Sequence, residues 1–165
     1  MVAFLYRMDV GYPGCVNRAE TAHVEAGTIN TTTPPTAFGI AVANDANGIR
    51  MVTGADTAVA GIYVRPYPIQ PNTGGLNYPL GVATPPTVGN GDVLKRGYII
   101  VKLASTAAAV KGAPVQVWTG AAAGPHVVGG INADAAAGGS NIVLPNSYFM
   151  GPADTNGIVE IAVNI

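Results

Sequence analysis

Apolar and polar residues alternate over the last eight positions of the chain. Four apolar side chains share one face there: Val159, Ile161, Val163 and Ile165. A period of two over such a length is typical of a half-buried strand. The run Asp154–Gly157 before it has turn chemistry, because Asp accepts backbone amide hydrogens and Gly tolerates positive φ. Residues 146–165 are therefore predicted to form a strand, a turn and a strand, with Val159, Ile161 and Val163 buried.

The same alternation recurs along the chain. Short strands are predicted at residues 38–43, 49–53, 61–65, 98–103, 115–119, 126–131 and 141–144. Asn44–Gly48 joins the first two into a hairpin, because Asn-Gly is a strong turn signal. Ser105–Val110 is the best candidate for a helical turn, and no long amphipathic helix is visible. Strands at this spacing predict an all-β fold, a jelly-roll-like barrel or sandwich.

Two stretches lack this periodicity. Residues 1–37 are broken by Pro and Gly, and we interpret them as an extended N-terminal arm with room for one short strand within 16–25. Residues 66–92 hold six prolines and five glycines. Because Pro removes a donor from a central strand, this stretch is predicted to be a long Pro/Gly-rich loop, and loops of such length are often functional. The predicted division is an arm at 1–37 and a single barrel or sandwich domain at 38–165. The pattern does not decide whether the arm packs on its own barrel or reaches a neighbouring subunit.

Composition narrows the classes of function. The chain of 165 residues is 48% hydrophobic and rich in Gly (22 residues) and Pro (13 residues), which fits many short strands joined by turns. Only 10% of the residues are charged and the net charge is −1, against about 25% charged residues in an average protein. Nucleic-acid binding is not expected, because the few basic residues form no patch. Membrane binding is not expected either, because no run approaches the ~18 apolar residues of a spanning helix. A surface with so few charges suits a protein covered by neighbours and suits a plain small-residue β protein equally well.

Two repeated Asp-x-Asn-Gly runs, at Asp45 and Asp154, resemble the start of a calcium-binding loop. Such a loop needs Gly at its sixth position and Glu at its twelfth, and counting from Asp45 these are Arg50 and Asp56. Turn chemistry is therefore the favoured interpretation. The two histidines have no His or Cys at the spacing of a zinc site. We expect neither a metal nor another cofactor.

No catalytic motif is apparent. The serines, Ser105, Ser140 and Ser147, do not lie in a G-x-S-x-G run, and no phosphate-binding loop is present. Cys15 with His23 or His126 is one pairing that sequence leaves open, because such partners meet in space and not along the chain. We expect no catalytic residues and no enzymatic activity.

Apolar side chains stand out in the two stretches that lack periodicity. In the arm they are Phe4, Leu5, Tyr6 and Tyr12, and in the loop they are Tyr67, Ile69, Leu76 and Tyr78. Apolar groups in a loop must pack either on the protein's own core or on a partner. These eight residues are the candidates for contact with a partner.

Five blocks of sequence, in their order and spacing, resemble the podovirus-type structural cement proteins of tailed phages. The blocks are PPTAFGIAVA (34–43), ADTAVAGIYVRPYP (55–68), GDVLKRGYIIVKL (91–103), GAPVQVW (112–118) and YFMGPADTNGIVEIAVNI (148–165). The resemblance covers nearly the whole chain, and residues 69–90 carry the least of it. It implies a jelly-roll-like decoration protein that is assembled in the host cytoplasm and lies on the outer surface of the phage head. It brings no catalytic, metal or cofactor residues with it.

The resemblance also implies partners. A cement protein bridges neighbouring major capsid protein subunits and stabilises the expanded shell, and the eight apolar candidates would contact the capsid. Capsid lattices offer twofold and threefold positions, so a homodimer is expected, with a trimer as the alternative. The competing class of function is a carbohydrate-binding jelly roll of a fibre or lectin, which needs an exposed aromatic platform beside Asp or Asn.

Overall fold

The computed structural model describes residues 11–66, 84–134 and 140–165, and the regular elements in them are strands apart from one short 3-10 turn. In chain order they are η1 (Ala19–Thr21), β1 (His23–Thr28), β2 (Ala41–Asp45), β3 (Gly48–Met51), β4 (Gly61–Val64), β5 (Asn90–Lys102), β6 (Pro114–Trp118), β7 (Ile131–Asn132), β8 (Asn141–Phe149) and β9 (Ile158–Val163). The all-β prediction is confirmed. No described helix is long and apolar enough to cross a membrane.

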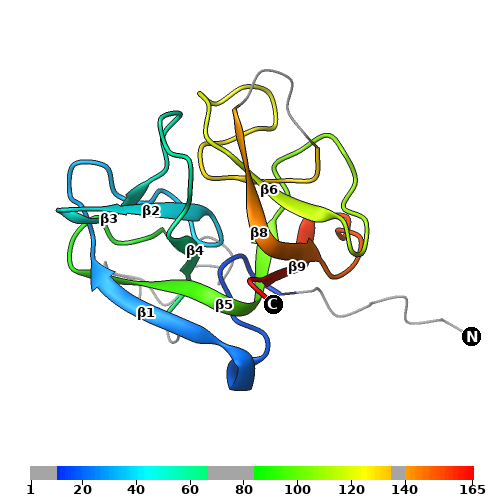
Figure 1. The fold of residues 1–165 in the computed structure, drawn as a ribbon, viewed down its shortest axis with the longest axis horizontal. Coiled ribbons are helices and arrows are strands. Elements are labelled where there is room, and N and C mark those ends of the chain that lie inside the picture. The colour runs from blue at the N-terminus through cyan, green and yellow to red at the C-terminus, as the bar shows by residue number, and fades with distance from the viewer. Residues whose placement is uncertain (1–10, 67–83, 135–139) are drawn as a thin grey trace, which may run out of the picture.

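Strand β5 organises the sheet. The strand order is β3-β2-β4-β5-β9-β8-β6-β7, and β1 pairs with β5 as a branch from this path. The first half of β5 lies between β4 and β1, and its second half pairs with β9, all antiparallel. Figure 1 shows the outcome: β1 to β4 gather around one half of β5, while β6, β8 and β9 gather around the other. One 13-residue strand therefore joins two lobes.

Each lobe curls back on β5. In the first lobe a bridge between Ile29 and Ile49 brings the end of β1 against β3. In the second lobe a bridge between Leu103 and Ile131 brings the end of β5 against β7. These two bridges turn the antiparallel sheet into a curled, barrel-like structure of the jelly-roll kind that the alternation predicts.

A glycine marks the point where β5 changes partners. Gly97 has a φ of +134°, and a Cβ at this position would lie 3.0 Å from the Cα of Ala22. L side chains rarely adopt this backbone conformation, and the space is already filled. Gly97 thus lets one strand serve two lobes.

The core lies on both faces of the first lobe's sheet. Along β5, Leu94 belongs to the main cluster and its neighbour Val93 to a smaller one. Along β4, Ile62 and Tyr63 divide in the same way. The sequence of a strand with both faces buried is a continuous apolar run and does not alternate between apolar and polar residues. The main cluster continues into the second lobe, so the two lobes share one core.

The C-terminal strand agrees with its pattern. Val159, Ile161 and Val163 are buried, as predicted, and Ile161 pairs with Ile99 of β5. Ile165 shares their periodicity but is exposed, because Asn164 adopts a positive φ of 53° after β9 has ended. The alternation of apolar and polar residues thus predicted the strand correctly but placed its end too far along the chain.

The described part of the predicted arm packs on its own barrel. Gly14 N donates to Ile100 O at 2.7 Å, Ile100 N donates to Cys15 O at 2.9 Å, and Asn17 N donates to Tyr98 O at 3.0 Å. Residues 23–28 then form β1 and join the sheet. From residue 11 onward the segment interpreted as an arm is therefore part of the body.

Three local expectations were wrong. The stretch 126–131 is mostly turn, and only Ile131 enters a strand. Ser105–Val110 is not helical, because the Ser105 hydroxyl accepts a hydrogen bond from the Ala107 amide and forms a local turn. Strand β5 begins at Asn90, inside the predicted loop 66–92.

Candidate functional site

The groups considered for catalysis lie on separate elements. Cys15 is half-buried beside β5, His23 begins β1 with its Nε2 3.4 Å from Glu25 Oε1, and the His126 ring stacks on Trp118 at 4.4 Å. No hydrogen bond links the cysteine to either histidine in the described part of the chain. Nor does that part contain three His, Cys, Asp or Glu side chains placed to hold a metal ion.

Both Asp-x-Asn-Gly runs form turns. Asp45 Oδ1 accepts the Asn47 amide at 2.8 Å. Asp154 Oδ1 accepts the amides of Asn156 and Ile158, each at 2.8 Å. Each carboxylate thus bonds to the backbone of its own turn, which is the turn chemistry predicted from sequence.

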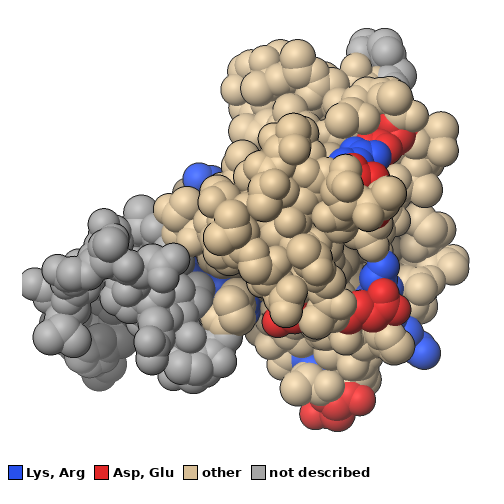
Figure 2. Space-filling view, turned by 90° about the vertical axis from the view of Figure 1, so that its left-hand side faces the viewer, with Lys and Arg blue, Asp and Glu red and all other residues tan. Residues whose placement is uncertain are grey.

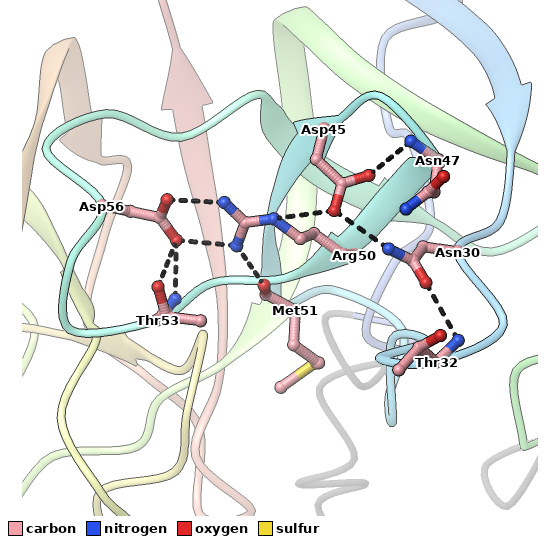
Figure 3. Close-up of polar contacts among 8 residues, drawn as sticks. All are labelled: Asn30, Thr32, Asp45, Asn47, Arg50, Met51, Thr53 and Asp56. Carbon is pink, nitrogen blue, oxygen red and sulfur yellow. Dashed lines mark hydrogen bonds and ion pairs between the residues drawn. The ribbon is translucent and has the colours of Figure 1, made fainter.

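A connected cluster of polar side chains is centred on Arg50 of β3 (Figure 3). Its guanidinium donates two hydrogen bonds to the Asp56 carboxylate, from Nη2 to Oδ1 at 2.7 Å and from Nη1 to Oδ2 at 2.9 Å. Nη1 also donates to Met51 O at 2.8 Å, and Nε lies 3.5 Å from Asp45 Oδ2. The hydrogen bonds from Arg50, together with those from Thr53, lower the pKa of Asp56 to about 2.

This cluster stabilises the fold. Asn30 Nδ2 donates to Asp45 Oδ2 at 2.9 Å, and Asn30 Oδ1 accepts the Thr32 amide at 2.9 Å. The network thus ties the hairpin β2–β3 to the loop after β3 and to the segment after β1 (Figure 3). Because its charges and amides are directed at groups of the same chain, the network is better suited to holding these segments than to binding a ligand.

A groove lies where the segment before β2 meets the end of β5 and the loop after β6. Its volume is about 420 Å³. The lining is mainly apolar, and the residues used below are Phe38, Ile40, Lys102, Leu103, Pro125 and Val127. Lys102 is the charged residue among the lining, and it is exposed. Val127 is 47% exposed. The groove therefore offers an apolar floor with a cationic group on its wall.

Both stretches that carry the contact candidates adjoin this groove. Pro13, just after the arm's apolar residues, and Thr84, just after residues 67–83, both line it. Gly14 O accepts the Arg65 amide at 2.8 Å, and the Arg65 guanidinium lies 5.2 Å from the Tyr12 ring centre. The two candidate segments thus join the body side by side.

One of the eight candidate residues can be placed. Tyr12 is 44% exposed and stacks with Arg65, so it is accessible beside the groove. The other seven lie outside the described residues: Phe4, Leu5, Tyr6, Tyr67, Ile69, Leu76 and Tyr78. Their predicted contact role stays a prediction.

The groove itself was missed from sequence, because it is assembled from five separated segments. One feature of the sequence could have indicated this surface: residues 112–133 include no Asp, Glu, Lys or Arg. Within this run the loop Ala121–Pro125 is exposed. The exposed loop after β3 lies close to the same run, because a Cβ placed on Gly54 would be 3.7 Å from Thr119 O. Figure 2 shows a broad uncharged area in the upper and central part of its face, with the acidic side chains toward the right-hand and lower edges.

One family profile matches almost the whole chain. The profile of the XM1 gp53 minor capsid protein family matches residues 1–163. A chain in the solved structure titled "The capsid of Myoviridae Phage XM1" is similar with a TM-score of 0.64 and 18% sequence identity, covering 94% of this chain and 91% of that one. At that identity the likeness shows the fold. No curated protein matches the chain.

Proposed function

We propose that this chain, which belongs to the XM1 gp53 minor capsid protein family, is a cement protein that bridges neighbouring major capsid protein subunits on the outer surface of a phage head. The family and the fold give it a structural role in a phage capsid, and hence in the virion. The proposal adds four points to this role: a position on the outer surface, assembly in the host cytoplasm, the bridging of subunits, and the character of a podovirus-type cement protein.

The observation that carries the proposal is the groove and its position. An apolar groove with the exposed Tyr12 beside it forms a surface that soluble monomers rarely leave exposed. Binding energy in protein interfaces is concentrated where a few apolar anchors fill such depressions. A protein that grips the expanded shell and not its precursor stabilises the expanded state by mass action. The sparse charge of the chain, at 10%, fits a surface that is covered in the assembled particle.

The proposal includes the absence of enzymatic activity. Supporting it, the described cysteine and histidines lie apart from one another, and the Asp56 carboxylate is held by Arg50. It also includes self-association as a dimer, with a trimer as the alternative, since capsid lattices present both symmetries.

Four of the described aromatic residues give the lectin alternative no support. Tyr63, Trp118 and Phe149 are buried, with exposed fractions of 9% or less. Tyr98 lies under the guanidinium of Arg18, 4.0 Å from its ring centre. These four rings do not form the open platform that sugar stacking needs.

The test compares two exposed valines. Val127 lines the groove, and Val143 of β8 is 57% exposed and does not line it. We expect Val127→Asp to weaken binding to heads stripped of this protein at least tenfold, about 1.4 kcal/mol, because a charge would enter the apolar contact. Val143→Asp is the matched control and should bind as the wild type does. Melting temperatures of both free variants should stay near that of the wild type.

The same assay covers the candidates outside the described residues. Tyr67→Ala with Tyr78→Ala, and deletion of residues 1–12, should each reduce binding at least tenfold. Added wild-type protein should raise the melting temperature of stripped heads. Failure of the wild-type protein to bind heads would refute the cement proposal, while equal binding by all variants would refute only the assignment of this surface.

A further inference from the structure

Among the described residues, strand β1 has no partner strand on one of its edges, and its side chains are exposed on both faces. It pairs with β5 over residues 23–28, and every residue in it except Gly27 is exposed. Val24 is 41% exposed, although it is an apolar residue within a strand. Figure 1 shows β1 at the outer margin of the first lobe. Strands with these properties pair readily with further strands unless something covers them.

The hydrogen-bond register shows which backbone groups are available. Ile29 N donates to Gly89 O at 2.8 Å, and the pairing with β5 is continuous from Val24 to that point. In an antiparallel ladder, alternate residues direct their N–H and C=O groups to the partner strand. Val24 and Ala26 therefore direct theirs away from β5, and no described strand pairs with this side of them.

We propose that this edge pairs antiparallel with the same edge of a second copy, around a twofold axis at Glu25. In this register Val24 faces Ala26 of the partner subunit, so each copy's two outward-facing residues exchange hydrogen bonds with the other's. A self-complementary patch of this kind is what a twofold interface requires. Main-chain pairing at an exposed sheet edge is also a recurrent mode of protein association.

The side chains on β1 favour a second copy of the chain as the partner. The two Glu25 carboxylates would face each other, and like charges in that position repel. Each carboxylate, however, has Lys95 Nζ at 3.3 Å on its own chain, so the paired edges bring their own counter-charges. Ala26 and Gly27 are small enough for the two backbones to approach.

This inference specifies, and rests on, the self-association within the proposed function. It is tested on the free protein without capsids, so its failure is distinguishable from failure of capsid binding. The variant is Ala26→Pro, because Pro is tolerated where the strand's N–H faces outward, and it removes that donor without breaking the ladder with β5. Ala26→Ser keeps the donor and is the matched control.

Sedimentation equilibrium should show a wild-type dimer. Its dissociation constant should rise at least tenfold in Ala26→Pro and stay unchanged in Ala26→Ser, with thermal melting of dilute samples reporting that both variants fold. A monomeric wild-type protein, or a dimer that a folded Ala26→Pro protein retains, would overturn the proposal.

A crosslink tests the register independently of proline. In a Cys15→Ser background, Glu25→Cys should form a disulfide-linked dimer on mild oxidation, because facing residues of a non-hydrogen-bonded pair have Cα atoms about 4.5 Å apart, within disulfide range. His23→Cys is the control, since it would face Gly27 of the partner subunit. Equal crosslinking of both variants, or none with Glu25→Cys, would contradict a twofold axis at Glu25.

Discussion

At the scale of single residues, the contact between Arg50 and Asp56 has the clearest consequence for solution behaviour. The Asp56 side chain is 15% exposed and takes hydrogen bonds from the Arg50 guanidinium and from Thr53. These interactions lower its pKa from an ordinary value of 3.8 to about 2. A carboxyl group that is more acidic in the folded state than in the unfolded one stabilises the fold only while it is ionised.

Asp56→Asn should therefore destabilise the protein at neutral pH by about 1–2 kcal/mol, allowing for partial screening by solvent. The contribution of Asp56 is complete above its unfolded pKa near 4 and is lost as the pH falls toward 2. The gap in unfolding free energy between wild type and variant, measured by urea denaturation at a series of pH values, should narrow over this window. A gap that is constant from pH 7 to pH 2 would show that the carboxylate charge contributes nothing.

Sequence predicts some of these residues and not others. The burial of Val159, Ile161 and Val163 follows from alternation alone, because one face of a strand must be covered. The Arg50–Asp56 contact does not follow. It depends on the path of the loop after β3, where the Asp56 carboxylate also bonds to Thr53, and local propensity does not encode that path.

At the scale of elements, the backbone conformation of Gly97 in β5 determines whether the two lobes can form together. Replacement of Gly97 by Ala forces a φ of +134° on an L residue and brings a Cβ to 3.0 Å from Ala22 Cα. We expect Gly97→Ala to cost about 1–3 kcal/mol. Gly151→Ala is the control, because a Cβ there meets nothing within 4 Å and the backbone φ is not in the positive region. Thermal melting should show a clear loss for the first variant and almost none for the second.

The same strand shows where pattern reasoning at the level of elements stops. Residues 98–103 are mostly apolar, with three β-branched side chains in a row at 99–101, and were predicted as a strand, but β5 begins eight residues earlier at Asn90. Asn, Gly and Asp have low strand propensity, yet Asn90, Gly91 and Asp92 all pair with β1. Pairing with β1, and at Asp92 with β4 as well, overrides local preference there, which is the usual weakness of propensity in sheets.

At the scale of the whole molecule, the shared core makes the two lobes one folding unit. The main cluster joins Ala41, Ile62 and Leu94 of the first lobe with Val115 and Leu144 of the second. Neither lobe can lose its structure without exposing part of the other's core. We expect a single thermal transition in scanning calorimetry, with equal calorimetric and van't Hoff enthalpies. Two resolved transitions would show that the lobes unfold separately.

The fold class and the candidate groove differ in how far sequence could predict them. Alternation and turn signals are local, and they sufficed for an all-β barrel-like fold. The groove is a property of the assembled molecule, since Pro13, Phe38, Lys102 and Val127 come together only after β5 has paired with both lobes. Such a surface cannot be read from a run of residues.

The attachment of residues 14–17 to β5 has a mechanical consequence. Three backbone hydrogen bonds, from Gly14 to Ile100, from Ile100 to Cys15 and from Asn17 to Tyr98, lie along the second half of β5, the longest described strand. Tension applied through the N-terminus in the direction of β5 would load these bonds together in shear, and they would not open one after another like a zipper. The force would be transmitted to β5, the strand that both lobes share. The N-terminal segment is therefore attached to the strand whose pairing holds the two lobes together.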